Sequence, residues 1–175
     1  MDWKKEIITQ NDYFSFVEVY SKNISEIIIT ASGGPFRNYT REQLQNVTVE
    51  QALNHPTWNM GPKITIDSAS LANKGLEVIE AVRLFDFDPS RVKVVVHPQS
   101  LIHSLVRTND GVLYAQISDP DMRHPILGAL TWPENIHNYL TPFDLAGHEM
   151  TFFAPRLDDF PLLRLAYECA KKGNS

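Results

Sequence analysis

Two short segments of the sequence combine serine hydroxyls with small residues, a composition typical of anion-binding turns. Ser32 precedes two glycines and a proline, and Ser68 opens the string Ser-Ala-Ser. Each serine is expected just after a strand, where free backbone N–H groups and the start of a helix favour a bound anion. A serine in front of a helix is more often a simple N-cap, and for Ser68 taken alone the cap is the commoner interpretation.

A run of polar residues follows Ser68, in the order Asn-Lys-Gly-Leu-Glu-Val-Ile-Glu. In a helix, Asn73, Glu77 and Glu80 lie along one stripe, with Lys74 beside Glu77. By pattern alone, a solvated face with a Lys–Glu pair explains this run better than a site does. Gly75 points the other way, because a glycine inside a helix costs about 1 kcal/mol relative to alanine. It indicates close approach by a backbone or a ligand.

The segment 54–62 reads as a loop from its prolines and glycine, yet it carries three large side chains: His55, Trp58 and Met60. Loops that hold large side chains often close over a ligand. We therefore expect this loop to move over a binding site.

The other histidines and the cysteine favour structural roles. His97 and His103 flank Pro-Gln-Ser in an apolar context and lack the spacing of a His-Glu-x-x-His zinc motif, so both are interpreted as structural. The single cysteine, Cys169, lies on an apolar helical face and is interpreted as a core residue. No Gly-x-Gly-x-x-Gly dinucleotide fingerprint occurs, and one glutamate cannot hold a divalent ion alone.

Composition narrows the class of protein. The chain has 175 residues, a formal net charge of −5 and 43% hydrophobic residues, which suits one domain with a real core. A negative balance argues against nucleic-acid binding, and the apolar runs are too short to cross a membrane. With one cysteine and no recognisable signal peptide, we expect a cytoplasmic protein, or a plastid one in a eukaryote.

The elements that must position these residues alternate between strands and helices. A short buried strand is expected at residues 27–29, and capping boxes predict helices after Thr40 and Thr48. The remaining expected elements are a possible strand at 12–20, a strand at 63–66, a helix at 68–85, strands at 92–96, 101–106 and 112–117, and a helix at 161–172. An Asn-Asp-Gly turn predicts a hairpin between the last two strands.

These elements predict an α/β or α+β fold, with a mixed sheet and helices packed on one face. Leu71, Val78, Val82 and Phe85, widened by Leu76 and Ile79, form the apolar face of the helix at 68–85. A linker with three prolines at 132–155 leads to the last helix. The apolar stripe of that helix is expected at Leu162, Leu165, Ala166 and Cys169.

Five strings in this order resemble the 1-deoxy-D-xylulose 5-phosphate reductoisomerase family. They are Ala-Ser-Gly-Gly-Pro-Phe-Arg at 31–37, His-Pro-Thr-Trp-Asn-Met-Gly at 55–61, Asp-Ser-Ala-Ser-Leu-Ala-Asn-Lys-Gly-Leu-Glu at 67–77, His-Pro-Gln-Ser-Leu-Ile-His at 97–103 and Pro-Asp-Met-Arg at 120–123. The resemblance implies NADPH- and metal-dependent rearrangement and reduction of a sugar phosphate to 2-C-methyl-D-erythritol 4-phosphate, in non-mevalonate isoprenoid biosynthesis.

The resemblance also implies roles for the residues found above. Ser32, Ser68, Asn73 and Lys74 resemble the residues that bind the phosphate in the family. His55, from the mobile loop, joins this set. Glu77 resembles a ligand of Mg or Mn, and Glu80 resembles a residue that orients the metal site. Trp58 resembles a residue of the lid that covers the substrate. By the same resemblance, Met60 and Met122 would line the pocket. Among these, the catalytic set is Glu77, Lys74, His55 and Trp58.

The chain departs from the family in what surrounds these motifs. Family members are more than twice as long as this chain. They begin with an NADPH-binding domain and carry an Asp-Ser-Glu motif that supplies two further carboxylates to the metal. Neither this domain nor this motif is found in the sequence. By resemblance, residues 24–130 form a catalytic and dimerisation domain, 131–157 a linker and 158–175 the first helix of a truncated helical domain, with 1–23 unassigned.

Partners and activity follow from the same comparison. The family implies a homodimer that binds a sugar phosphate, with neither nucleic acid nor membrane as a partner. We expect the 175-residue chain alone to be inactive and to bind metal poorly. The alternatives are a stand-alone, non-catalytic sugar-phosphate binder and a structural subunit for a partner that supplies the missing domains.

Overall fold

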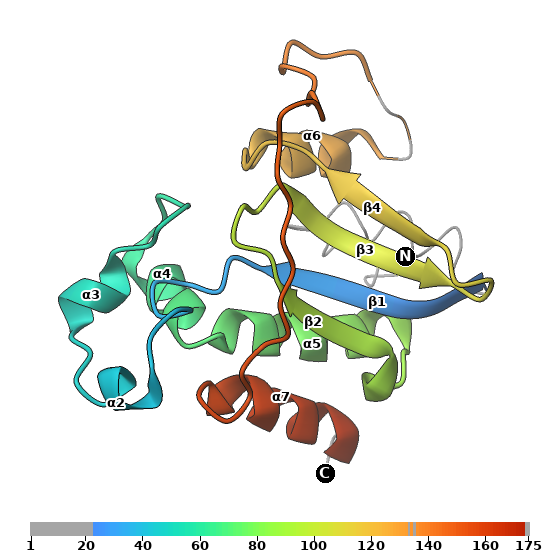
Figure 1. The fold of residues 1–175 in the computed structure, drawn as a ribbon. Helices are drawn as coiled ribbons and strands as arrows, with labels where there is room; N and C mark the ends of the chain where they lie inside the picture. Colours follow the sequence, from blue (N-terminus) through green and yellow to red (C-terminus); the bar gives the residue numbers. More distant parts are fainter. Residues whose placement is uncertain (1–22, 133, 135, 174–175) are drawn as a thin grey trace.

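A mixed sheet of four strands, in the order β2-β1-β3-β4, forms the centre of the molecule (Figure 1). This computed structural model describes residues 23–132, 134 and 136–173, so the possible strand at 12–20 lies outside the described residues. β1 (Ile24–Ala31) pairs in parallel with β2 (Val92–Val96) and antiparallel with β3 (Ile102–Thr108), and β3 pairs antiparallel with β4 (Leu113–Ile117). The predicted mixed sheet and the hairpin at 109–111 are confirmed.

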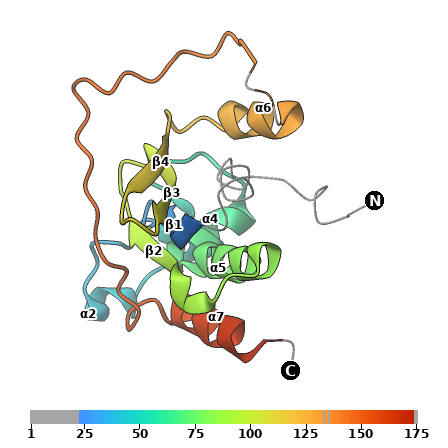
Figure 2. The same cartoon turned by 90° about the vertical axis from the view of Figure 1, so that its right-hand side faces the viewer.

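The two faces of the sheet are covered differently. α5 (Ala72–Phe85) packs on one face, where its residues Val78 and Ala81 are fully buried with Ile27 of β1. The segment that joins α6 (Arg123–Thr131) to α7 (Pro161–Lys172) crosses the opposite face (Figures 1 and 2). Backbone hydrogen bonds of 2.8 and 2.9 Å between Val96 and Phe153 tie this segment to the end of β2.

Three short helices lie in the connections. α2 (Arg41–Leu44) and α3 (Val49–Leu53) both begin with the predicted capping boxes, in which a threonine hydroxyl and a glutamine side chain satisfy each other's backbone N–H groups. The 3₁₀ helix η3 (Pro89–Arg91) leads into β2. None of the helices in the described part of the chain is long and apolar enough to span a membrane.

The strand expected at 63–66 is wrong, because these residues belong to helix α4 (Pro62–Ala69). Pro62 stands at the first turn, where its fixed φ suits a helix and its missing N–H is not needed. The hydroxyl of Thr65, a buried residue, donates to the carbonyl of Gly61 at 2.9 Å. The alternation of apolar and polar residues at 63–66 therefore belongs to a helix, and the buried side of this helix carries Thr65, Ser68 and Ala69.

The helix expected at 68–85 begins later than predicted, because the chain turns between α4 and α5. Leu71, with φ of 58°, takes the left-handed conformation there and is 2% exposed. Ser68 therefore lies inside α4 and is not an N-cap. Along α5, Val78 and Val82 are buried as expected, whereas Leu76 is 57% exposed and does not widen the apolar face.

α7 forms where the sequence predicts it, but it buries a different stripe. Leu163, Ala166 and Ala170 are buried, whereas Leu162, Leu165 and Cys169, expected in the stripe, are exposed. The reason is the packing of α7 on α5: a Cβ on Gly75 would lie 2.8 Å from Ala166 Cβ. The close approach that Gly75 indicated is confirmed, and its cause is α7.

Candidate functional site

Most of the predicted site residues line one cavity of about 240 Å³. It opens beside the end of β1 and is bordered by the loop at 54–61, by α4 and α5, by the start of β3 and by the turn before α6. The lining includes eight predicted residues: Ser32, Trp58, Met60, Ser68, Asn73, Lys74, Glu77 and Met122. Two predicted residues are not part of this lining: Glu80, which lies further along α5, and His55, which contacts the lining residues Ser32 and Ser68.

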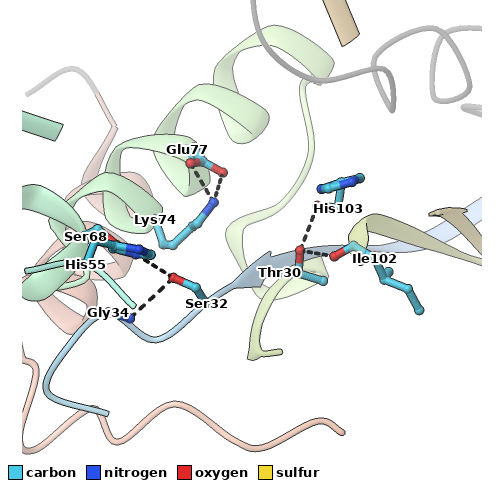
Figure 3. Close-up of polar contacts among 9 residues, drawn as sticks. All are labelled: Thr30, Ser32, Gly34, His55, Ser68, Lys74, Glu77, Ile102 and His103. Atoms are coloured by element: carbon cyan, nitrogen blue, oxygen red, sulfur yellow. Dashed lines mark hydrogen bonds and ion pairs between the residues drawn. The ribbon is translucent and has the colours of Figure 1, made fainter. Parts of the chain in front are cut away.

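His55 connects the loop to the two serines (Figure 3). Its Nε2 lies 3.0 Å from Ser32 Oγ and 3.2 Å from Ser68 Oγ. Its Nδ1 accepts hydrogen bonds from the backbone N–H groups of Thr57 and Trp58 at 3.1 and 2.9 Å. Because Nδ1 is the acceptor, the neutral ring carries its proton on Nε2 and donates it toward the serine hydroxyls. One side chain thus holds the loop against both serines.

The charge on His55 depends on its surroundings. Burial lowers the pKa of the imidazole, and the positive charge of Arg37 lowers it further. The neutral ring is therefore favoured near pH 7 in the structure as it stands. An anion placed between the two serines would favour the imidazolium and gain a stronger donor.

Glycines allow the two serines to approach each other. Gly33 and Gly34 follow Ser32 with φ of +85° and +65°, a conformation that suits glycine. A Cβ on Gly34 would lie 2.7 Å from the carbonyl oxygen of Ser68. Any other residue at this position would push the turn away from α4 and separate the two hydroxyls.

An ion pair occupies the first turns of α5. Lys74 Nζ lies 2.8 and 3.0 Å from the two carboxylate oxygens of Glu77, and both side chains are about four-fifths buried (Figure 3). Beside them, burial raises the pKa of Glu80, and the charge of Glu77 raises it further. Lys74 and Glu77 thus bring to the cavity a cation and an anion that neutralise each other and that two different ligands could separate.

Asn73 contributes a buried oxygen without a partner. Its Oδ1 is the only buried side-chain oxygen or nitrogen in the described part of the chain that makes no hydrogen bond. A buried acceptor of this kind costs about 1–3 kcal/mol when it is left unsatisfied. A hydroxyl group of a bound ligand would satisfy it, while the amide nitrogen can donate to an anion.

Sequence reasoning missed several residues of the cavity, of which His103 is the most informative. It is predicted to be structural, and it both lines the cavity and contacts Ser118: its Nε2 lies 2.9 Å from the Ser118 hydroxyl and 3.1 Å from the Ser118 carbonyl oxygen. His97 is structural as predicted: it is fully buried, bonded to the Thr151 carbonyl and to the Leu101 N–H. Other missed residues are Thr30, Asn59, Ile64, Ser100, Ile102, Gln116, Asp121 and Pro125.

The described residues do not make a complete metal site. They contain no group of three or more histidines, cysteines or carboxylates placed to hold a metal ion. Glu77 and Asp121 both line the cavity, but the Asp121 carboxylate is bound by Arg123, which lowers its pKa to about 2. Hard divalent cations require several oxygen ligands, so Glu77 fits as one ligand of a set that these residues leave unfinished.

Comparison with known proteins identifies the family. A family model described as the 1-deoxy-D-xylulose 5-phosphate reductoisomerase C-terminal domain matches residues 8–85, and a second, the DXP reductoisomerase C-terminal domain, matches residues 117–175. A curated reductoisomerase from Treponema denticola is 54% identical over 93% of this chain and 43% of its own length. One from Moorella thermoacetica is 56% identical over 87% of this chain and 40% of its own.

Solved structures agree with this assignment. A DOX-P reductoisomerase in complex with NADPH, fosmidomycin and magnesium superposes with a TM-score of 0.82 and 45% identity, covering 91% of this chain and 40% of that one. The Zymomonas mobilis enzyme in complex with NADPH gives 0.83 and 43%, covering 92% and 41%. The chain spans about two fifths of the length of these relatives. It belongs to the 1-deoxy-D-xylulose 5-phosphate reductoisomerase family.

Proposed function

We propose that this chain is the part of a 1-deoxy-D-xylulose 5-phosphate reductoisomerase that binds the sugar-phosphate substrate. The whole protein would rearrange and reduce that substrate with NADPH and Mg or Mn, as its relatives' names and bound groups suggest. The observation that carries the proposal is that Ser32, Ser68, Asn73 and Lys74 line one cavity, where His55 bridges the two serine hydroxyls.

The donors at the cavity suit a phosphate group. Two hydroxyls, an imidazole N–H, an amide and an ammonium can surround the three outer oxygens of a phosphate, which carries close to two negative charges near pH 7. Charge-assisted hydrogen bonds of this kind are about twice as strong as neutral ones. The partnerless Oδ1 of Asn73 then accepts a hydroxyl of the sugar.

In this arrangement, phosphate binding would also free the carboxylate of Glu77 to bind a cation. In the free chain Lys74 holds both oxygens of Glu77. A phosphate that draws Lys74 toward itself leaves the carboxylate of Glu77 free for a cation. Substrate binding and ligation by Glu77 are therefore coupled through one ion pair.

The loop at 54–61 covers the bound substrate in this proposal. Trp58 and Met60 line the cavity from the loop, and Met122 lines it from the other side. His55 anchors the loop to the serines that would hold the phosphate. A phosphate that replaces the serine contacts of His55 with its own thus changes how the loop is held and excludes water from the sugar.

Calorimetric titration of the 175-residue chain tests the proposal. We expect 1-deoxy-D-xylulose 5-phosphate to bind at least about tenfold more tightly than 1-deoxy-D-xylulose, because only the former has charge-assisted bonds to gain. Amide shifts in an NMR titration should centre on Ser32, Ser68 and Lys74. Equal binding of the two sugars, or shifts away from these residues, would refute the assignment.

Two further measurements separate the reductoisomerase from the alternatives. We expect no NADPH oxidation by the chain alone, since the described residues provide only part of a metal site. NADPH oxidation in a mixture with a protein that carries a dinucleotide-binding domain would favour the enzyme over a non-catalytic binder. A chain that copurifies with such a protein but binds no sugar phosphate would instead be a structural subunit.

A further inference from the structure

The turn that follows β1 borders two cavities. Ser32 lines the first, whereas Gly33, Arg37 and Asn38 line a second cavity of about 380 Å³. The segment that crosses the sheet on its way to α7 forms the other side of the second cavity, through Phe153, Ala154, Arg156 and Phe160. Its volume lies within the range of small-molecule sites, about 300–1,000 Å³.

The lining of this second cavity combines an apolar wall with positive charge. The apolar lining residues are Leu71, Val96, Pro98, Phe153 and Phe160, of which Phe153 is the exposed aromatic residue, at 56%, whereas Phe160 is buried beneath the guanidinium of Arg156. The only charged residues in the lining are two arginines, and no aspartate or glutamate is among the lining residues. An anion would meet no repulsion from the walls of the cavity.

Neither arginine is fully neutralised. No ion pair joins Arg37 to a carboxylate within the described residues, and its hydrogen bond to the Gly34 carbonyl is long, at 3.4 Å. Arg156 shares the carboxylate of Asp159, at 3.4 Å, with Arg41, at 3.2 Å. One carboxylate thus serves two guanidinium groups, which leaves a local excess of positive charge on a chain with a net charge of −5.

We propose that this cavity is a second binding site, which takes a small amphipathic anion. A carboxylate or phosphate group would meet Arg37 and Arg156, and an aromatic or aliphatic body would pack on Phe153. The arginines account for the charge of the ligand and the wall for its apolar part. The site is distinct from the sugar-phosphate cavity and does not rest on the function proposed for it.

NMR titration of the 175-residue chain with phenyl phosphate and phenylacetate tests this site, in a Lys74→Ala variant that weakens phosphate binding in the first cavity. We expect amide shifts at Gly33, at Phe153 and at Phe160 with both probes. Benzyl alcohol lacks the charge and inorganic phosphate lacks the ring, so each should bind at least about tenfold more weakly. Inorganic phosphate that shifts the same amides as strongly as phenyl phosphate would overturn the amphipathic assignment.

Charge-removing variants complete the test. Arg37→Gln and Arg156→Gln should each weaken phenylacetate binding about tenfold or more, whereas Arg83→Gln, at an exposed arginine in the last turn of α5, should not change it. Should Arg37→Gln fail to fold, Arg156→Gln and the shift map decide alone. Unchanged affinity in Arg156→Gln, or shifts confined to the first cavity, would refute the second site.

Discussion

Removing Lys74 and removing the charge of Glu77 should have opposite effects on phosphate affinity, although the two side chains form one ion pair. Glu77→Gln keeps the shape of the side chain but removes the charge that holds Lys74. The freed ammonium then faces the cavity without the carboxylate of Glu77 to compete with a ligand. In the metal-free chain we therefore expect Glu77→Gln to bind inorganic phosphate more tightly, and Lys74→Ala to bind it more weakly.

The magnitudes follow from the charges involved. Loss of a charge-assisted hydrogen bond costs about 1.5–3 kcal/mol, so Lys74→Ala should weaken phosphate binding about 10- to 100-fold. Glu77→Gln removes the competing ion pair, worth roughly 1 kcal/mol at this partial burial. It also removes repulsion between carboxylate and phosphate, about 1 kcal/mol at roughly 6 Å in a largely aqueous dielectric. Together these terms, about 2 kcal/mol, predict about 30-fold tighter binding.

Calorimetric titration with phosphate at constant ionic strength, in the presence of a chelator, measures both effects. Lys93→Ala removes an exposed cation from β2 and should leave affinity unchanged, which controls for net charge. Glu80→Gln removes the next carboxylate along α5, which is not part of the cavity lining, and should change affinity by less than Glu77→Gln. Weaker or unchanged binding in Glu77→Gln would refute the view that the ion pair competes with the ligand.

Three further predictions concern stability and assembly. Gly75→Ala should lower the free energy of unfolding, because overpacking against Ala166 costs about 1–3 kcal/mol and the gain in helix propensity is about 1 kcal/mol; denaturant unfolding should show no comparable loss for Gly61→Ala, where an added methyl meets nothing. Burial lowers the pKa of His103, so below about pH 6.5 the unfolded chain binds more protons than the folded chain. The free energy of unfolding should therefore fall from pH 7 to pH 5, and it should fall less steeply in His103→Gln. The exposed apolar side chains of edge strand β4 should support a homodimer, and a monomer in sedimentation at micromolar concentration would contradict it.

The sequence predicts local structure correctly where residues close together in the chain determine the conformation. The capping boxes of α2 and α3 and the turn at 109–111 depend on residues within four positions of one another, and all formed as predicted. The segment 63–66 differs because Ile64 and Ile66 alternate over too few residues to distinguish a strand from a helix. Pro62 was the available signal, since proline favours the first turn of a helix.

The buried stripe of α7 could not be chosen from the helix alone. Leu162 and Leu165 are as apolar as Leu163, so two stripes of the same helix compete for the core. The partner decides: α5 offers a position without a Cβ at Gly75, and the small side chain of Ala166 fits against it. Sequence reasoning recognised that Gly75 marked a close approach but had no means of identifying which element approached.

The same distinction explains what was recognised at the site. The proposed phosphate donors lie in the strings that carry the family resemblance, so the sequence alone predicts them. His103 was missed because it reaches the cavity only through the pairing of β1 with β3, a long-range contact that no local pattern specifies. The role of His55 as the link between Ser32 and Ser68 likewise appears only when the loop is placed.

Under the proposed function, phosphate binding and chemistry depend on different groups of residues. The groups that would hold the phosphate lie between Ser32 and Lys74, and contacts among β1, α4, α5 and one loop bring them together. The cation, by contrast, needs several oxygen ligands, of which the described residues offer Glu77. Phosphate affinity can therefore be measured on this chain by itself, and a failure to oxidise NADPH would say nothing against the phosphate site.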